Sequence, residues 1–194
     1  MFAPKLAQGK TIGIIGLGGI GINVATIGRG IGLKILASRR SATERQVIKD
    51  GVVDELFPPS ELHALLVESD IVVLAIPATA ETHRLIDATA FQAMKLGAIF
   101  VNISRGENID EEALASAIES GHLSGAYLDV FTGSEEGEQP PSALSALPNV
   151  LITPHIAARA DAPMPNTMDL FCNNLRRYLD GQPLENIVDW HRGY

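Results

Sequence analysis

The sequence predicts an α/β fold in which a doubly wound parallel sheet is followed by a C-terminal helix and tail. Short apolar, β-branched runs alternate with longer helical patterns along the chain, which is typical of βαβ units. One run, DIVVLAIP at 70–77, is apolar throughout its centre, as expected for a strand buried on both faces. A glycine-rich turn at 16–21 joins the first run to the first helical pattern.

The elements follow from these patterns in order. Strands are expected at 11–16, 34–38, 70–77, 98–104, 123–131 and 149–154, and helices at 21–31, 42–51, 60–69, 88–95, 110–121 and 165–179. Ser60 is expected to cap the third helix. The helix at 110–121 has acidic residues in its first turn and a glycine at its end, both favourable there. We expect one main domain, 1–157, and a C-terminal helix and tail, 158–194.

Composition excludes several classes of function. The net charge of −8 over 194 residues argues against nucleic acid or an anionic membrane as the main partner. The single cysteine, Cys172, excludes an intrachain disulfide and fits a cytoplasmic location. The five histidines are dispersed without metal-ligand spacing, so no metal is expected. The apolar stretch 12–28 contains six glycines, and we interpret it as strand, turn and helix rather than a membrane span.

The turn GLGGIG has the GxGxxG spacing of a dinucleotide-binding fingerprint between a strand and a helix. Gly16 allows the tight turn, Gly18 lets the backbone approach a pyrophosphate, and Gly21 lets the helix pack close to the sheet. The phosphates would meet N–H groups at the positive end of the helix. We therefore expect a Rossmann-type domain whose cofactor contacts are Gly16, Leu17, Gly18, Gly19, Ile20 and Gly21. The alternative is a turn whose glycines serve packing alone.

The end of the second strand indicates which dinucleotide binds. An acidic residue at this point would accept hydrogen bonds from the ribose hydroxyls of NAD, but the chain has Ser38, Arg39 and Arg40 instead. Guanidinium groups pair well with phosphate, and the Ser38 hydroxyl could add a donor. These residues predict NADP(H) in preference to NAD(H). The alternative is two solvated arginines at a strand end and a loosely bound NAD.

Three charged or polar residues follow successive expected strands: Arg105, Asp129 and His155. Carboxyl ends of parallel strands meet at one edge of the sheet, where α/β proteins bind ligands. An arginine there can hold a carboxylate through two parallel hydrogen bonds. Taken alone, each residue also has a structural interpretation, as a salt bridge, a turn cap or a loop histidine. Their convergence at one edge favours a functional site.

Five segments together resemble the D-isomer-specific 2-hydroxyacid dehydrogenases, in the order of that family. They are GKTIGIIGLGGIG, PATAETHRLID, MKLGAIFVNISRGENIDEEAL, GAYLDVF and LPNVLITPHIA. The similarity runs from about Gly9 to the C-terminus, and the tail is most similar to the glyoxylate/hydroxypyruvate reductase branch. The resemblance implies an oxidoreductase that reduces a small 2-keto acid to the D-2-hydroxy acid with NAD(P)H.

The resemblance also implies residue roles. Arg105 would bind the substrate carboxylate, His155 would be the general acid in reduction, and Asp129 would hold the nicotinamide carboxamide. The backbone of 76–79 would line the cofactor. The further cofactor contacts implied are Ile76, Pro77, Thr82, Ile103 and Ser104, with Arg105 and His155 bordering the same site. The family also pairs the histidine with a glutamate, which raises the histidine pKa. We expect Glu136 here, with Glu135 and Glu138 as alternatives and a non-functional acidic loop as the fourth possibility.

In the family, a portion that precedes the glycine turn builds most of the substrate domain, and the resemblance implies that these 194 residues lack that portion. We therefore expect 158–194 to be the remnant that would pack on that domain, with Ile187, Val188 and Trp190 exposed or repacked. Self-association, as a homodimer or otherwise, and impaired activity are expected as well. One alternative is a non-catalytic NAD(P)-binding sensor or partner-docking module. Another is oxidation of formate or phosphite, against which the glutamates argue.

Overall fold

The computed structural model describes residues 6–48, 51–134, 137–158 and 163–190. The chain divides into two compact units, Met1–His155 and Ile156–Tyr194. The first unit contains the sheet and the candidate site residues, and the second contains one long helix and the tail. In the described residues no helix is both long and apolar enough to cross a membrane.

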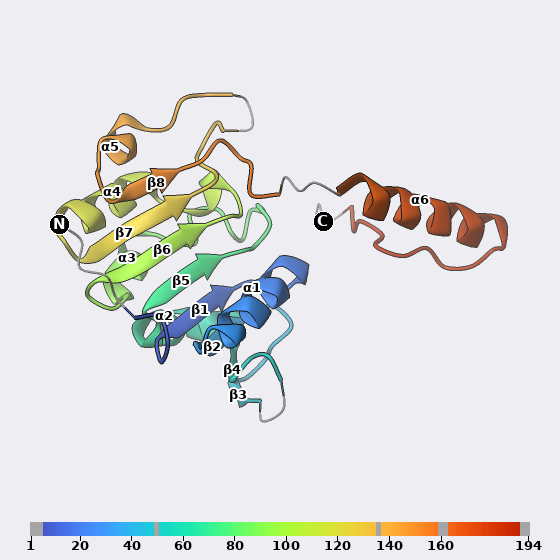
Figure 1. Ribbon diagram of the computed structural model, residues 1–194, viewed down its shortest axis with the longest axis horizontal. Coiled ribbons are helices and arrows are strands. Elements are labelled where there is room, and N and C mark those ends of the chain that lie inside the picture. Colours follow the sequence, from blue (N-terminus) through green and yellow to red (C-terminus); the bar gives the residue numbers. More distant parts are fainter. Residues whose placement is uncertain (1–5, 49–50, 135–136, 159–162, 191–194) are drawn as a thin grey trace. The chain divides into compact units, whose positions relative to one another are not determined.

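An eight-stranded sheet forms the centre of the first unit (Figure 1). Its strands are β1 (Thr11–Ile15), β2 (Lys34–Ser38), β3 (Gln46–Val47), β4 (Glu55–Phe57), β5 (Ile71–Leu74), β6 (Ala98–Asn102), β7 (Leu123–Leu128) and β8 (Val150–Ile152). Their order is β3-β4-β2-β1-β5-β6-β7-β8, and all neighbours are parallel except β3 and β4. The chain winds outward from β1 to one edge, then returns to β5 and winds to the other. This confirms the doubly wound α/β fold.

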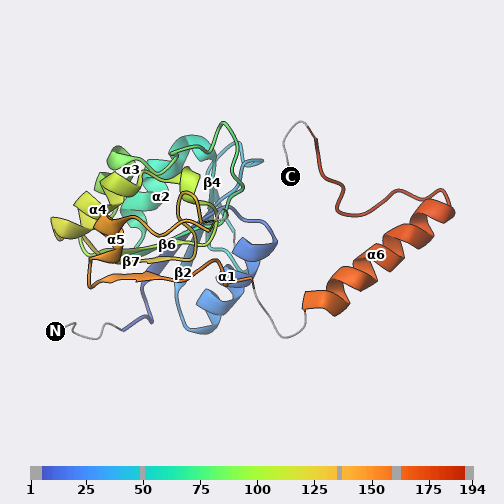
Figure 2. The ribbon, with the colours of Figure 1, turned by 90° about the horizontal axis from the view of Figure 1, so that it is seen from above.

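The helices cover the two faces unequally (Figure 2). The helix α1 (Gly19–Gly30) lies on one face, over β1 and β2. On the other face lie α2 (Leu62–Glu68), α3 (Ala88–Ala93), α4 (Glu111–Glu119) and α5 (Ser142–Ser145). Asp87 and Asp110 cap α3 and α4, because each side chain accepts a hydrogen bond from the main-chain N–H three residues on.

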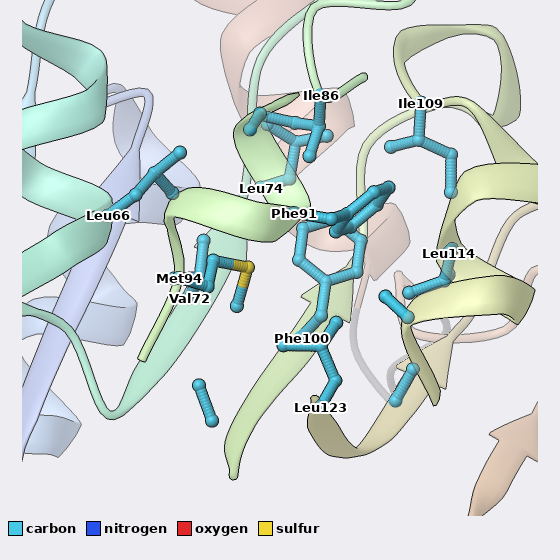
Figure 3. Packing of buried hydrophobic residues seen from close by; sticks show 14 of the residues in the cluster. Leu66, Val72, Leu74, Ile86, Phe91, Met94, Phe100, Ile109, Leu114 and Leu123 are labelled. Carbon is cyan, nitrogen blue, oxygen red and sulfur yellow. The ribbon is translucent and has the colours of Figure 1, made fainter. Parts of the chain in front are cut away.

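The main hydrophobic core lies between the sheet and α2–α5 (Figure 3). Phe91 of α3 and Phe100 of β6 are fully buried there, with ring centroids 5.2 Å apart at an interplanar angle of 86°. This edge-to-face arrangement is one that aromatic pairs prefer. Side chains alternate along a strand, so Ile99, the neighbour of Phe100, points to the opposite face and is 39% exposed.

The opposite face has a smaller core under α1, built around Ile14, Ile35 and Ala37. Among the described helices of the first unit, α1 alone lies on this face (Figure 2). Toward β8 the strands on this face are therefore less covered, and Leu151 is 61% exposed.

The second unit contains α6 (Pro163–Leu179) and a tail that returns along it. The side-chain amide of Asn174 bonds both main-chain groups of Glu185, at 2.9 and 2.8 Å, and Arg177 forms an ion pair with Glu185 at 3.2 Å. Many apolar side chains of this unit are exposed, namely Met168, Phe171, Leu175, Tyr178, Leu179, Leu184, Ile187, Val188 and Trp190. For Ile187, Val188 and Trp190, which were expected to be either exposed or repacked, the structure shows exposed side chains.

Some predicted elements are wrong. The helix expected at 42–51 is absent from its described residues, where Gln46 and Val47 form the short edge strand β3 against β4. A helix of ten residues has little stability of its own, whereas the edge of β4 satisfies the backbone directly. Ser60 does not cap α2, since it lies in a 3₁₀ turn, Pro59–Glu61, that precedes the helix. The strand β4 and the helix α5 were not predicted.

Candidate functional site

The glycine turn is held by contacts that leave no room for side chains at two positions. Gly16 has a φ of +101°, which favours glycine, and a Cβ there would meet the carbonyl group of Ala75. A Cβ on Gly21 would meet the carbonyl oxygen of Gly16. The N–H groups of Gly16 and Leu17 donate to the Ser38 carbonyl oxygen at 3.0 and 3.2 Å. The end of β2 therefore positions the turn.

The helix end beside this turn is suited to a dinucleotide. A Cβ on Gly18 or Gly19 would meet nothing within 4 Å, so the space over the turn is open. No side chain caps the N-terminus of α1, and its first turn has no acidic residue. The first N–H groups of a helix lack intrahelical partners and carry partial positive charge. The glycine turn therefore fits a pyrophosphate.

The Ser38–Arg40 segment is anchored through its main chain. Ser38 is 5% exposed, and its carbonyl oxygen holds the glycine turn, while the side chains of Arg39 and Arg40 are exposed. The Arg39 N–H donates to the Phe57 carbonyl oxygen at 3.4 Å. Farther along the loop, Arg45 lies over the Phe57 ring, 4.3 Å from its centroid, and bonds Glu55. The loop that carries the two arginines is thus attached to β4 at both ends.

Two buried asparagines support the loops after β5 and β6. The side-chain amide of Asn108 donates to the Ile76 carbonyl oxygen at 3.3 Å and to the Ser104 hydroxyl at 3.2 Å. Asn102 accepts from the N–H and hydroxyl of Ser104, at 3.0 and 2.7 Å, and donates to the Arg105 carbonyl oxygen at 2.9 Å. These bonds leave the backbone at Ile103–Arg105 little freedom. The Arg105 side chain is exposed.

The loop from Pro77 to Thr82 is closed by its own side chains. The Thr82 hydroxyl donates to the Pro77 carbonyl oxygen at 2.8 Å and accepts from the Thr79 N–H at 2.8 Å. The segment expected to line the cofactor is therefore an ordered turn, and Asn108 connects its start to the loop that carries Ser104.

The strand ends after β6, β7 and β8 are hydrogen-bonded to one another. The Asp129 N–H donates to the Asn102 carbonyl oxygen at 3.0 Å, and the Asp129 carbonyl oxygen accepts from the His155 N–H at 2.9 Å. Asp129 is 2% exposed, and its Oδ1 accepts from the Thr153 hydroxyl at 2.6 Å. His155 has a φ of +50°, an uncommon conformation for a residue with a side chain. These contacts bring Arg105, Asp129 and His155 onto adjacent loops.

Gly106 allows two of these loops to pass closely. A Cβ at this position would collide with the main chain at Phe131 and Thr132. Thr132 in turn donates its N–H to Glu111 at 2.7 Å. Burial raises the pKa of the Glu111 carboxyl above its ordinary value, against the hydrogen bond from Thr132. Beside it lies a pocket of ≈ 280 Å³, lined by residues that include His83 and Arg84.

The expected glutamate partner of His155 is not located. Glu135 and Glu136 lie outside the described residues. Glu138 is exposed, and its carboxylate lies against Gly133. No group of three or more His, Cys, Asp or Glu side chains suited to a metal ion occurs in the part of the chain that the structure describes.

Sequence reasoning missed Asn102, Asn108, Tyr127 and Thr153. A polar side chain inside or directly after an apolar strand was the available signal for Asn102 and Thr153, because such a residue needs a partner when it is buried. No local signal identifies Tyr127, whose partner Thr153 is 26 residues away, or the bond from Asn108 to Ile76, which is 32 residues away in the chain.

The comparisons with known proteins agree with this geometry. Residues 2–157 match the family model of the D-isomer specific 2-hydroxyacid dehydrogenase NAD binding domain. The chain is 39% identical to glyoxylate reductase of Thermococcus gammatolerans over 97% of its own length and 54% of that protein, and 40% identical to the Pyrococcus horikoshii enzyme over 93% and 52%. It thus spans about half the length of the curated relatives it matches.

Solved structures give the same fold. A D-isomer specific 2-hydroxyacid dehydrogenase from Xanthobacter autotrophicus, in complex with NADPH and MES, has a TM-score of 0.85 and 35% identity, covering 100% of this chain and 76% of that one. The NADPH-dependent glyoxylate/hydroxypyruvate reductase of Sinorhizobium meliloti, in complex with NADP and sulfate, has a TM-score of 0.85 and 31% identity, covering 100% and 60%. The D-lactate dehydrogenase of Lactobacillus jensenii with NAD⁺ has a TM-score of 0.77 and 29% identity, covering 96% of this chain and 58% of that one.

Proposed function

Since the chain belongs to the D-isomer specific 2-hydroxyacid dehydrogenase family and contains its NAD-binding domain, we propose that it serves NAD(P)H-dependent reduction of a small 2-keto acid. The substrate is of the glyoxylate or hydroxypyruvate type and the product is the D-2-hydroxy acid. The observation that carries the proposal is the main-chain linkage of Asn102, Asp129 and His155, which gathers an acid–base group, a carboxylate and the Arg105 loop at one sheet edge.

The chain's own residues have distinct parts in this reaction. The bound dinucleotide supplies the hydride. The turn Gly16–Gly21 holds its pyrophosphate, and the segments at 76–82 and 103–104 border it. Arg105 pairs with the substrate carboxylate, and Asp129 orients the nicotinamide carboxamide. The His155 ring donates the proton that the keto oxygen takes up, with Glu136 as its proposed partner and Glu135 or Glu138 as alternatives.

We further propose NADP(H) as the preferred cofactor. The exposed side chains of Arg39 and Arg40 stand on a loop anchored to β4, and two of the similar structures contain NADPH or NADP. Another similar structure contains NAD⁺, so the similar structures do not distinguish the two cofactors. The support for NADP(H) in this chain comes from the two arginines. A guanidinium pair favours a 2′-phosphate, whereas a carboxylate at this strand end favours NAD.

Activity of these 194 residues by themselves is proposed to be low, because they span about half of the similar reductases and a site open on one side does not exclude water. The many exposed apolar side chains of the second unit support self-association, as a homodimer or otherwise. A cytoplasmic location is the corresponding proposal for the whole protein. The alternative function is an NAD(P)-binding module without catalysis.

Titration of the purified chain with NADPH and NADH, followed by nicotinamide fluorescence at low salt, tests the proposal. The expected result is tight binding of NADPH and weak binding of NADH. Binding of neither cofactor would overturn the proposal. Glyoxylate-dependent NADPH oxidation by the wild type and by His155→Ala, measured at a protein concentration high enough to detect the low turnover expected of these 194 residues, then separates the two functions. An enzyme loses its turnover on this substitution, whereas a binding module shows no turnover in either form and keeps its NADPH affinity.

A further inference from the structure

Three side chains, from β7, the residue that follows it and the loop after β8, form a directed chain of hydrogen bonds. The Thr153 hydroxyl donates to Asp129 Oδ1 at 2.6 Å, and the Tyr127 hydroxyl lies 2.8 Å from Thr153 Oγ1. A threonine hydroxyl has one proton, which Thr153 gives to the carboxylate. The Tyr127 hydroxyl must therefore be the donor in the second bond, and the chain runs from Tyr127 through Thr153 to Asp129.

The sheet brings these residues together. Tyr127 and Asp129 are two residues apart at the end of an extended strand, so their side chains are on the same face. Leu128 of β7 pairs with Ile152 of β8, and the Thr153 N–H donates to the Leu128 carbonyl oxygen at 2.9 Å. This register places the Thr153 hydroxyl beside the Asp129 carboxylate, which is 2% exposed. A buried carboxylate is costly without such donors.

We propose that Tyr127 and Thr153 are positioning residues that set the orientation of the Asp129 carboxylate toward the nicotinamide end of the cofactor. This inference rests on the proposed function, in which Asp129 holds the nicotinamide carboxamide. The bond to Oδ1 restricts rotation of the carboxyl group, and a donor behind Thr153 strengthens that bond, because linked hydrogen bonds polarise one another.

The Thr153 hydroxyl acts on Asp129 separately from the main-chain contacts of the same loop. The His155 N–H donates to the Asp129 carbonyl oxygen at 2.9 Å and to the Thr153 carbonyl oxygen at 3.0 Å. Both contacts use main-chain atoms, which a side-chain substitution at Thr153 leaves in place. Changes in Tyr127 or Thr153 should therefore affect the nicotinamide contact and not the adenosine half of the site.

The experiment compares NADP⁺ with 2′-phospho-ADP-ribose, which lacks the nicotinamide, by calorimetric titration. Tyr127→Phe is expected to weaken NADP⁺ roughly 3- to 10-fold and Thr153→Val roughly 10- to 100-fold, as for loss of a neutral and a charge-assisted hydrogen bond. Thr153→Ser, which keeps the hydroxyl, should bind NADP⁺ with an affinity near the wild-type value. Affinity for 2′-phospho-ADP-ribose should stay within about twofold throughout. Tyr178→Phe, at an exposed tyrosine of the second unit, is the matched control.

The outcomes separate this inference from the proposed function. If the wild type binds both probes and Tyr127→Phe and Thr153→Val bind NADP⁺ as the wild type does, the positioning role is overturned and the proposed function stands. Equal weakening of both probes also overturns it, since that indicates a general structural effect. If the wild type binds neither these two probes nor NAD⁺, the proposed function and this inference fail together. If it binds only NAD⁺, the same variants are compared on NAD⁺ and ADP-ribose, with the same expected and contradicting results.

Discussion

The main-chain carbonyl oxygen of Asp129 accepts a hydrogen bond from the main-chain N–H of His155 at 2.9 Å. This bond joins the loops that follow the two neighbouring strands β7 and β8. On its other side, Asp129 donates its N–H to Asn102 at the end of β6. Main-chain hydrogen bonds at the ends of the strands therefore hold the two residues that bear the candidate functional side chains, Asp129 and His155.

Gly18→Ala should separate cofactor binding from stability. The added methyl group would meet no protein atom within 4 Å, and the backbone at φ −94° and ψ −161° accepts alanine. The unfolding free energy should fall by about 1 kcal/mol or less. Binding of NADPH should weaken roughly tenfold or more, or about 1.4 kcal/mol, because the methyl group occupies the space over the turn. Urea unfolding and fluorescence titration measure the two effects.

Gly21→Ala is the counterpart of this variant. Its methyl group would meet the Gly16 carbonyl oxygen, so we expect a loss of about 1–3 kcal/mol of stability from overpacking. Unchanged NADPH affinity in Gly18→Ala, together with unchanged stability in Gly21→Ala, would contradict the role assigned to this turn.

The pair Arg39→Ala/Arg40→Ala should change cofactor preference. Loss of charge-assisted hydrogen bonds to a 2′-phosphate is expected to weaken NADPH roughly 10- to 100-fold, while NADH affinity stays within about twofold. Titrations at one fixed salt concentration are needed, because salt screens these charges. Each single variant, Arg39→Ala and Arg40→Ala, is also compared with Arg176→Ala, at an exposed arginine of α6, which removes the same single charge. A parallel loss of NADPH and NADH affinity would show that the arginines do not read the phosphate.

Adjacent residues of β6 should differ sharply in their contribution to stability. Phe100→Ala removes a fully buried ring and should cost about 3–5 kcal/mol. Ile99→Ala, on the less covered face where Ile99 is 39% exposed, should cost about 1 kcal/mol. Urea unfolding of both variants is the measurement. Similar losses would mean that both faces of β6 are equally covered in solution.

Glu111→Gln should stabilise the protein near pH 7 and not near pH 4. Burial raises the folded-state pKa of Glu111, so ionisation costs folded-state stability. That cost begins as the pH rises through the unfolded-state pKa, about 4.3, and is complete above the folded-state pKa. Glutamine keeps an acceptor for the Thr132 N–H without the charge. Urea unfolding at the two pH values tests this, with the exposed neighbour Glu112→Gln as control. Equal changes at both pH values would contradict it.

Much of the fold could be predicted, because its signals are local. The apolar runs at β1, β2 and β5–β8 and the glycines of the first turn are readable within windows of a few residues. Residues 42–51 show where this fails. Their pattern is compatible with a helix, but β4 offers Gln46 and Val47 a backbone partner, and a neighbouring strand is not visible in the segment itself.

The site could be predicted as a set of residues but not as an arrangement. Arg105, Asp129 and His155 were identified by their positions after strands, and the glycine turn by its spacing. The supporting residues Asn102, Asn108, Tyr127 and Thr153 were not identified. The bonds Asn108–Ile76, Tyr127–Thr153 and Thr153–Asp129 join residues far apart in the chain, whereas the Asn102 side chain bonds its near neighbours Ser104 and Arg105.

By itself, the sequence determined the alternation of strands and helices, the dinucleotide fingerprint and the order of the charged residues after the strands. Periodicity and turn chemistry act between near neighbours, so a short window contains them. Only the tertiary structure decided that Tyr127, Thr153 and Asp129 are in one hydrogen-bonded chain. Their contact depends on strand order and on the register of β7 against β8, which are set by packing of the whole sheet and helices.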